Sequence, residues 1–114
     1  MDNKKDDEYY INKVIENIDA IISYTKGIEY EEFADDEMLI DATMFRLVQM
    51  AENMNKITSE FKEKNKNIKW GLISGFRNGI VHDYGKTDYT IVYDIITTNI
   101  QELKEILLTS LKEF

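Results

Sequence analysis

Apolar residues recur every three or four positions over most of the chain, which is the spacing of helices that bury one face. The first stripe predicts a helix over roughly residues 6–26, and Gly27 stands where a helix commonly ends in a left-handed turn. The acidic stretch 29–36 follows as a connection, with a short helical turn expected around Phe33. The apolar positions of this first helix are Ile11, Val14, Ile15, Ile18, Ile21 and Ile22.

A second stripe predicts the longest element of the chain. Asp35 or Asp36 is a good N-cap for it, because a short acidic side chain can accept a hydrogen bond from the first free backbone amides. The pattern then runs to Phe61 and ends in a Lys/Asn-rich segment over 62–67. Its apolar positions are Leu39, Phe45, Leu47, Val48, Ala51, Met54, Ile57 and Phe61.

A third helix is predicted between Asn67, which can cap its start, and Gly85, its natural end. Its apolar positions are Ile68, Leu72, Phe76 and Ile80. The same helix carries Gly71, Gly75 and Gly79 on one face. Each interior glycine costs about 1 kcal/mol relative to alanine. Three together therefore predict the close approach of a second backbone, either another helix of this chain or the same helix of a second subunit in a twofold dimer.

The last stripe predicts a helix over roughly 91–111, with a kink or break near 97–99 because the stretch 90–98 is rich in β-branched residues. Its apolar positions are Ile91, Val92, Ile95, Ile96, Ile100, Leu103, Ile106, Leu107 and Leu111. Proline is absent and no internal repeat or strand hairpin is visible. We therefore expect an all-α fold, an antiparallel bundle of four to five helices, in a single domain over residues 1–114.

Charge is distributed unevenly along the chain. The net charge is -8, which argues against general affinity for nucleic acid. The window 62–86, however, has six basic residues against two acidic ones, and the rest of the chain has eight against twenty. This cationic strip either attracts an anion or is a solvated loop.

The cysteine content and the hydropathy favour a cytoplasmic protein. With no cysteine, the sequence carries neither disulfides nor thiolate metal sites. The first eight residues are polar rather than signal-like, and no apolar run approaches the roughly 18 residues of a membrane span.

One short segment gathers most of the candidate chemistry. The chain has one histidine and two arginines, and Arg77-Asn78 is followed closely by His82-Asp83-Tyr84. In a helix, Arg77 and Tyr84 are seven residues apart and share a face, while Asn78 and His82 are adjacent on a neighbouring face. We therefore expect all four side chains to border one groove.

The segment resembles the R-x(4–6)-H-x-Y motif of HEPN-domain ribonucleases, here with four residues between Arg77 and His82. With Trp70 and the glycines upstream, it is most similar to the HepT-like toxins of prokaryotic toxin–antitoxin pairs. The resemblance covers the whole chain in size and helical order, and residues 70–84 in specific motif. It implies a HEPN-like bundle that cleaves RNA without a metal or other cofactor, in an active site assembled across a homodimer.

The chemistry of the motif suits that expectation. When a ribose 2′-OH attacks the neighbouring phosphate, the reaction needs a proton acceptor, a donor to the leaving oxygen and a cation beside the phosphorane. Histidine exchanges protons near neutral pH, and His82 is the only one. Arg77 presents a permanent forked charge to phosphate oxygens, and Asn78 is placed to orient the phosphate or the imidazole. One histidine per chain makes a shared dimeric site the simplest way to supply both an acid and a base.

Tyr84 has a separate role by resemblance. In the family, the matching tyrosine accepts AMP groups from a small nucleotidyltransferase antitoxin, which implies such a partner for this chain. Phosphates added beside Arg77 would occupy the cation and repel RNA.

Other interpretations of these residues stay open. His82 can be a helix C-terminal cap, Arg77 a solvated or paired cation, Tyr84 a core filler with a polar tip, and Trp70 a core residue. A different class of protein is a non-catalytic subunit that presents a docking surface to a nucleotidyltransferase. A metal enzyme is disfavoured, because one histidine and no cysteine leave only carboxylate ligands.

Overall fold

The computed structural model describes residues 3–114, excepting the side chains of residues 3–5 and of Leu72. No strand occurs in this described part of the chain, which is helical over most of its length. The elements in order are α1 (Asn3–Thr25), α2 (Tyr30–Asp35), α3 (Glu37–Asn55), α4 (Ser59–Lys64), α5 (Trp70–His82), the 3₁₀ turn η1 (Tyr84–Lys86), α6 (Tyr89–Asp94), the π segment η2 (Ile95–Asn99) and α7 (Ile100–Leu111). The all-α prediction is confirmed.

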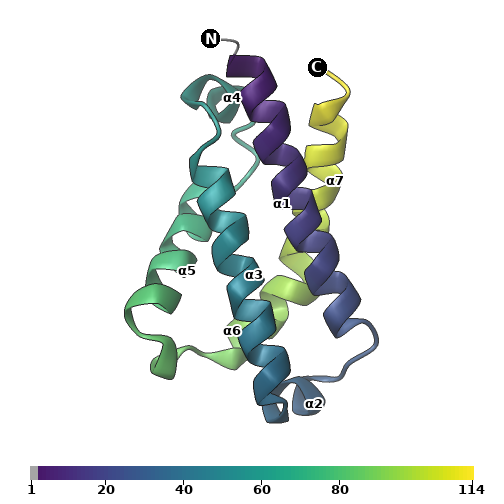
Figure 1. Cartoon of the computed structure of the whole chain (residues 1–114), viewed down its shortest axis with the longest axis vertical. Helices are drawn as coiled ribbons and strands as arrows, with labels where there is room; N and C mark the ends of the chain where they lie inside the picture. The colour runs from purple at the N-terminus through teal and green to yellow at the C-terminus, as the bar shows by residue number, and fades with distance from the viewer. Residues whose placement is uncertain (1–2) are drawn as a thin grey trace.

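The long helices run alternately up and down the molecule, and both termini lie at the same end (Figure 1). Helix α1 packs on α3 and on α7, and α5 packs on the other side of α3 (Figure 1). The core between α1, α3 and α7 includes the fully buried Ile18, Met44, Leu47 and Leu107. Because α5 is the outermost long helix, one side of it faces the bundle and the other is left uncovered.

Several helix ends that the sequence predicts from local signals are confirmed. Gly27 has a φ of 73° and follows α1, as its left-handed role predicts. The short turn around Phe33 is α2, and Phe33 is buried. Asp36 is the N-cap of α3, with Oδ1 accepting from the Leu39 amide at 3.0 Å. The predicted kink near 97–99 lies in the π segment η2, where the Thr97 hydroxyl donates to the Tyr93 carbonyl at 2.7 Å.

The second stripe is not one helix, which corrects the prediction of a single longest element. The chain breaks after Asn55, so that α1, with 23 residues, is longer than α3, with 19. Thr58 caps α4, and the buried carboxylate of Asp7 in α1 accepts hydrogen bonds from the Thr58 amide at 2.8 Å and from its hydroxyl at 2.6 Å. A cap held from another helix therefore ends the periodic run.

The boundaries predicted for the third helix are also wrong at both ends. Asn67 does not cap it, because Lys69 is the N-cap residue and makes no side-chain capping bond. Gly85 does not end it, because the backbone already leaves the helix at Asp83, with a φ of -153°, and enters η1. The side chain of Leu72, one of its predicted apolar positions, lies outside the described residues.

Candidate active site

Helix α5 carries the motif, with Arg77 in its middle and His82 as its last residue. Tyr84 lies beyond the helix, at the start of η1. A helix turns by about 100° per residue, so that Arg77 and His82, five residues apart, leave its axis in directions about 140° apart. The side chains expected to border one groove are thus divided between two sides of α5.

Arg77 faces α3, where its charge is already paired. Its Nη2 forms an ion pair with Oε1 of Glu52, and the arginine side chain is 29% exposed. Its Nη1 donates to the Asn78 side-chain oxygen at 3.0 Å. The buried Nε donates to no described atom. A phosphate can bind both nitrogens of this guanidinium only after it displaces the Glu52 carboxylate.

Tyr84 also reaches α3. Its hydroxyl donates to Oδ1 of Asp41. Partial burial, together with the hydrogen bond to this carboxylate and its negative charge, raises the pKa of the phenol well above its ordinary value. The side chain nevertheless remains partly exposed. The shared direction predicted for Arg77 and Tyr84 therefore survives, although Tyr84 is outside the helix that the prediction assumed.

Sequence reasoning missed the two carboxylates that hold these side chains. Asp41 and Glu52 are eleven residues apart in α3, which is about three helical turns and places them on one face. That spacing was a readable signal for a face of α3 that offers two anions. What the sequence lacks is any sign that α5 packs against this particular face.

The other side of α5 is an open edge that we call the glycine edge, formed by Gly71, Gly75 and Gly79. A Cβ built on any of these three glycines would meet no described atom within 4 Å. The close approach of another helix of the same chain is therefore contradicted. His82 follows Gly75 by seven residues and so points within about 20° of it, and both His82 and Asn78 are exposed.

The glycine edge continues into a groove between α5 and the start of α6. This groove has a volume of about 380 Å³, and Gly75, Gly79 and Asp83 lie on one wall of it. Ile91, on the facing wall, is half exposed. The uncovered side of α5 thus combines a flat backbone, an apolar neighbour and the chain's one imidazole.

The cationic strip of residues 62–86 is largely neutralised in the fold. Four of its six basic residues pair with carboxylates: Lys64 with Glu60, Lys66 with Glu63, Arg77 with Glu52 and Lys86 with Asp83. Lys62 instead lies over the ring of the half-buried Trp70, 5.6 Å from its centroid. This pairing favours the solvated-loop interpretation of the strip.

Comparisons with known proteins point in one direction. The family model described as "Ribonuclease HepT-like" matches residues 14–109, which include the whole motif. The curated protein "Putative RNase TTE0752" of Caldanaerobacter subterraneus is 31% identical over 84% of this chain and 86% of its own length. "Putative RNase MJ1380" of Methanocaldococcus jannaschii is 28% identical over 90% and 94%. "Probable ribonuclease HepT" of Thermococcus cleftensis is 25% identical over 89% and 92%.

No solved structure matches this chain. Among the described helices, none has both the length and the apolar character needed to cross a bilayer.

Proposed function

This chain belongs to the HepT-like ribonuclease family, and from that premise we propose that it is a toxin that cleaves RNA without a metal ion, in a site that two copies build together. The observation that carries the proposal is the motif itself, Arg77-Asn78 with His82 and Tyr84 on and just after α5, within the part of the chain that the family model matches. The names of the relatives support RNA as the substrate.

In this mechanism the ribose 2′-oxygen attacks the adjacent phosphorus while His82 takes the 2′-OH proton. The bond from phosphorus to the 5′-oxygen breaks, and that oxygen takes a proton from His82 of the partner subunit. The products are a 2′,3′-cyclic phosphate and a 5′-hydroxyl. Arg77 turns away from the α3 side of α5 as it exchanges Glu52 for phosphate, and its guanidinium then stabilises the charge on the phosphorane oxygens. Asn78, which is hydrogen-bonded to Arg77, holds the fork in position.

The glycine edge supports the dimeric part of the proposal. Nothing in the described chain covers it, and its three glycines leave room for a second backbone. Because His82 lies on the same side of α5, a second copy packed there brings the two His82 side chains to one interface. Packing between the two subunits, rather than within one chain, then offsets the helix stability that the three glycines cost.

Tyr84 is the proposed site of control. A nucleotidyltransferase antitoxin transfers AMP to its hydroxyl: the phenolic oxygen attacks the α-phosphorus of ATP, and pyrophosphate leaves. The phenol proton already points at Asp41, which is positioned to accept it. The new phosphate would stand beside Asp41 and repel it, and its charge would make the α3 side of α5, which also holds Arg77, less attractive to RNA.

The test is expression of the wild type, His82→Ala and Val81→Ala without any partner in a bacterial host. We expect growth arrest and RNA cleavage for the wild type and for Val81→Ala, a half-exposed neighbour on α5 that has no role in the mechanism. For His82→Ala we expect at least about a hundredfold loss of cleavage by the purified protein in the presence of a chelator, as for removal of a general acid–base group.

Normal growth and intact RNA for all three proteins would contradict the enzyme and favour the non-catalytic docking subunit. Cleavage that a chelator abolishes would contradict metal independence alone.

A further inference from the structure

The second arginine of the chain, Arg46 in α3, has no part in the site described above. Its Nη1 donates to the side-chain oxygen of Asn17 at 3.2 Å, and its Nε donates to the hydroxyl oxygen of Tyr24 at 3.3 Å. Its Cζ lies 5.9 Å from the ring centroid of Tyr24 and 6.0 Å from that of Phe45. The guanidinium thus sits beside two aromatic rings on the α1–α3 side of the bundle.

The charge of Arg46 is not paired within the described chain. No described carboxylate oxygen lies within 4.0 Å of it, whereas Arg77 has Glu52. Of the five N–H groups of a guanidinium, two are used here, so that three remain to donate. On a chain of net charge -8, a half-buried arginine without an acidic partner is a position where an external anion is favoured.

A buried asparagine also holds the Arg46 side chain in position. Asn17 is buried, with 6% of its surface exposed, and its amide nitrogen donates to the Lys13 carbonyl at 2.9 Å. That bond fixes the orientation of the amide and turns its oxygen toward Arg46. Part of the entropy cost of binding an anion is therefore already met in the free protein.

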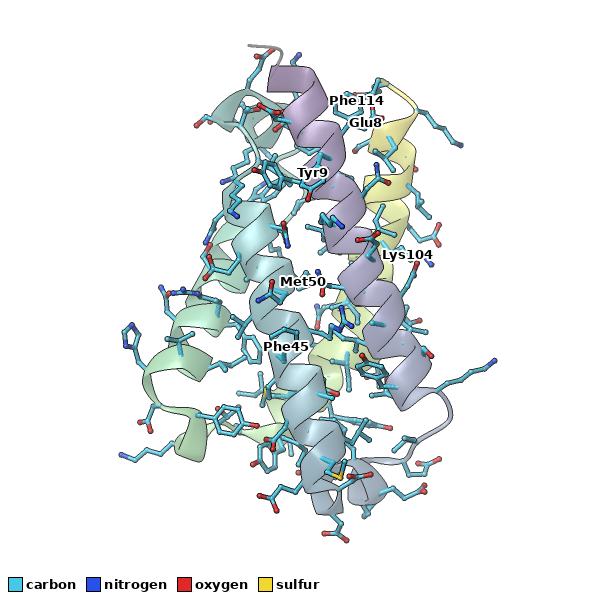
Figure 2. The ribbon with its side chains drawn as sticks, in the orientation of Figure 1. Glu8, Tyr9, Phe45, Met50, Lys104 and Phe114 are labelled. Carbon is cyan, nitrogen blue, oxygen red and sulfur yellow. The ribbon has the colours of Figure 1, made fainter. Side chains whose placement is uncertain are left out.

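Both aromatic residues are exposed to solvent, although the guanidinium lies over each ring. Phe45 is 58% exposed and Tyr24 is 37% exposed. Phe45 lies on the outer face of α3 (Figure 2). A cation with free donors beside exposed aromatic rings is the combination that binds single-stranded nucleic acid, because the phosphate takes the charge and an unstacked base covers a ring.

We propose that Arg46, Tyr24 and Phe45 form an accessory site for single-stranded RNA. The guanidinium binds one backbone phosphate, and a base stacks on the ring of Phe45 or Tyr24. The proposal rests on the proposed function in one respect, that the RNA held here is the RNA cut at α5. It also accounts for how an acidic protein retains its substrate, since most of the strip 62–86 is neutralised by carboxylates.

The chain offers a matched control in α1. The Nζ of Lys13 lies 5.5 Å from the ring centroid of Tyr9, whose side chain is 56% exposed. Lys13 forms an ion pair with Glu16 at 3.1 Å, so that the charge beside this ring is already neutralised. Tyr9 lies on α1 nearer the end of the bundle that holds the termini (Figure 2). Removing its ring should leave RNA binding unchanged.

The experiment measures the binding of a short fluorescent single-stranded RNA by anisotropy, at several salt concentrations, with His82→Ala as the parent so that no cleavage occurs. Adding Phe45→Leu should weaken binding by about fivefold or more, as for loss of one base–aromatic stack. Adding Arg46→Gln should lower the slope of log affinity against log salt by about 0.7, as for one lost phosphate contact. Adding Tyr9→Leu should change neither quantity.

Equal affinity and equal salt slope for the parent, the Phe45→Leu protein and the Arg46→Gln protein would overturn the accessory site. Should these variants keep RNA affinity but lose binding to a nucleotidyltransferase, the surface serves a protein and the RNA proposal is equally wrong. Because Phe45 is exposed, its variant keeps the test valid even where Arg46→Gln unfolds through the loss of the Asn17 contact.

The outcomes also separate this site from the proposed enzyme. Normal RNA cleavage by the wild type, together with unchanged RNA binding in the variants, defeats only the accessory site. Weakened RNA binding in the variants, with no cleavage by the wild type, defeats only the enzyme.

Discussion

The two sides of α5 differ in what their side chains meet. On the side facing α3, Arg77 and Tyr84 are engaged by Glu52 and Asp41, so that a cation and a phenol are both held by carboxylates of one helix face. On the opposite side, His82 is exposed, and a Cβ added anywhere on the glycine edge would meet no described atom within 4 Å. The functional groups on the inward side are thus held by hydrogen bonds and ion pairs, whereas the outward side is not covered by any described helix.

This difference indicates how the proposed enzyme is regulated and completed. Arg77 and Tyr84, on the inward side, can bind a ligand only if it displaces a carboxylate. A phosphate group can do this at Arg77, because it binds a guanidinium through the same pair of hydrogen bonds. In the proposed dimer, a second backbone covers the outward groups, which would offset the cost of a glycine-lined face in helix stability. Substitutions on one side should therefore change assembly, and substitutions on the other should change ligand binding and titration.

The largest effect is expected from Gly75→Leu on the outward side. A Cβ added there meets no described atom within 4 Å, and the groove beside it is open, so the chain should fold with its free energy of unfolding unchanged or raised by up to about 1 kcal/mol. In a twofold dimer, overpacking costs about 1–3 kcal/mol per copy, so that the dissociation constant should rise by at least about 30-fold. The fraction of dimer, measured by analytical ultracentrifugation, and the rate of RNA cleavage per chain should fall together.

Glu105→Leu is the matched control, since it places the same side chain on an exposed position of α7. A Gly75→Leu protein that dimerises and cleaves RNA like the wild type would show that the outward side is not the interface.

A smaller effect is expected from Glu52→Gln on the inward side. It removes the carboxylate that competes for Arg77, and this pair is partly exposed. Pairs of this kind contribute about 0.2–1 kcal/mol, so RNA affinity in the His82→Ala background should improve by about 1.4- to 5-fold. Glu105→Gln, which removes the same charge from an exposed position of α7, is the control. Weaker RNA binding by Glu52→Gln alone would mean that Glu52 positions Arg77 for RNA rather than masking it.

The smallest effect is expected from Asp41→Asn. Without this carboxylate, the pKa of Tyr84 should fall toward its ordinary value, because a hydrogen-bonded and nearby negative charge no longer disfavours the phenolate. An ultraviolet absorbance titration, with Tyr84→Phe to identify this one of the seven tyrosines, measures the shift. Glu37→Gln should give a smaller shift in the same direction, since Glu37 acts on Tyr84 by charge alone.

The sign of the accompanying pH dependence follows from the direction of the shift. A phenol whose pKa is raised by folding stabilises the native state while it stays protonated, and this contribution is lost as pH rises above about 10, where the unfolded phenol ionises. The stability of the wild type should therefore fall more steeply in alkali than that of Asp41→Asn. Parallel unfolding curves for the two proteins above that pH would contradict the contact between Tyr84 and Asp41.

The fold was predictable where the signal lies within a few residues of its effect. Gly27 and Asp36 act on their own backbone, and the β-branched run before Asn99 distorts its own helix, so a single sequence contains all the information needed. The break after Asn55 was not predictable in this way. It depends on Asp7, a residue of another helix that holds the cap at Thr58.

The candidate site divides along the same line. The motif residues were recognisable because their order and spacing are local, and their catalytic roles remain predictions to be tested by the variants described above. The partners Glu52 and Asp41 were not recognisable, because a carboxylate in α3 becomes relevant only when α5 lies beside it. Arg46 had no signal at all, since Asn17, Tyr24 and Phe45 come from two helices and surround it only after packing.

The sequence by itself determined the helical class, most of the helix positions and the chemistry available at α5, because periodicity, capping and short motifs are properties of neighbouring residues. Tertiary structure alone decided which charges are neutralised and which surfaces stay open. Among the described residues, Arg77 has a carboxylate partner while Arg46 has none, and no helix covers the glycine edge. The reason is physical: Coulomb interactions and burial depend on distances in space, and residues far apart in the chain acquire those distances only when the helices pack.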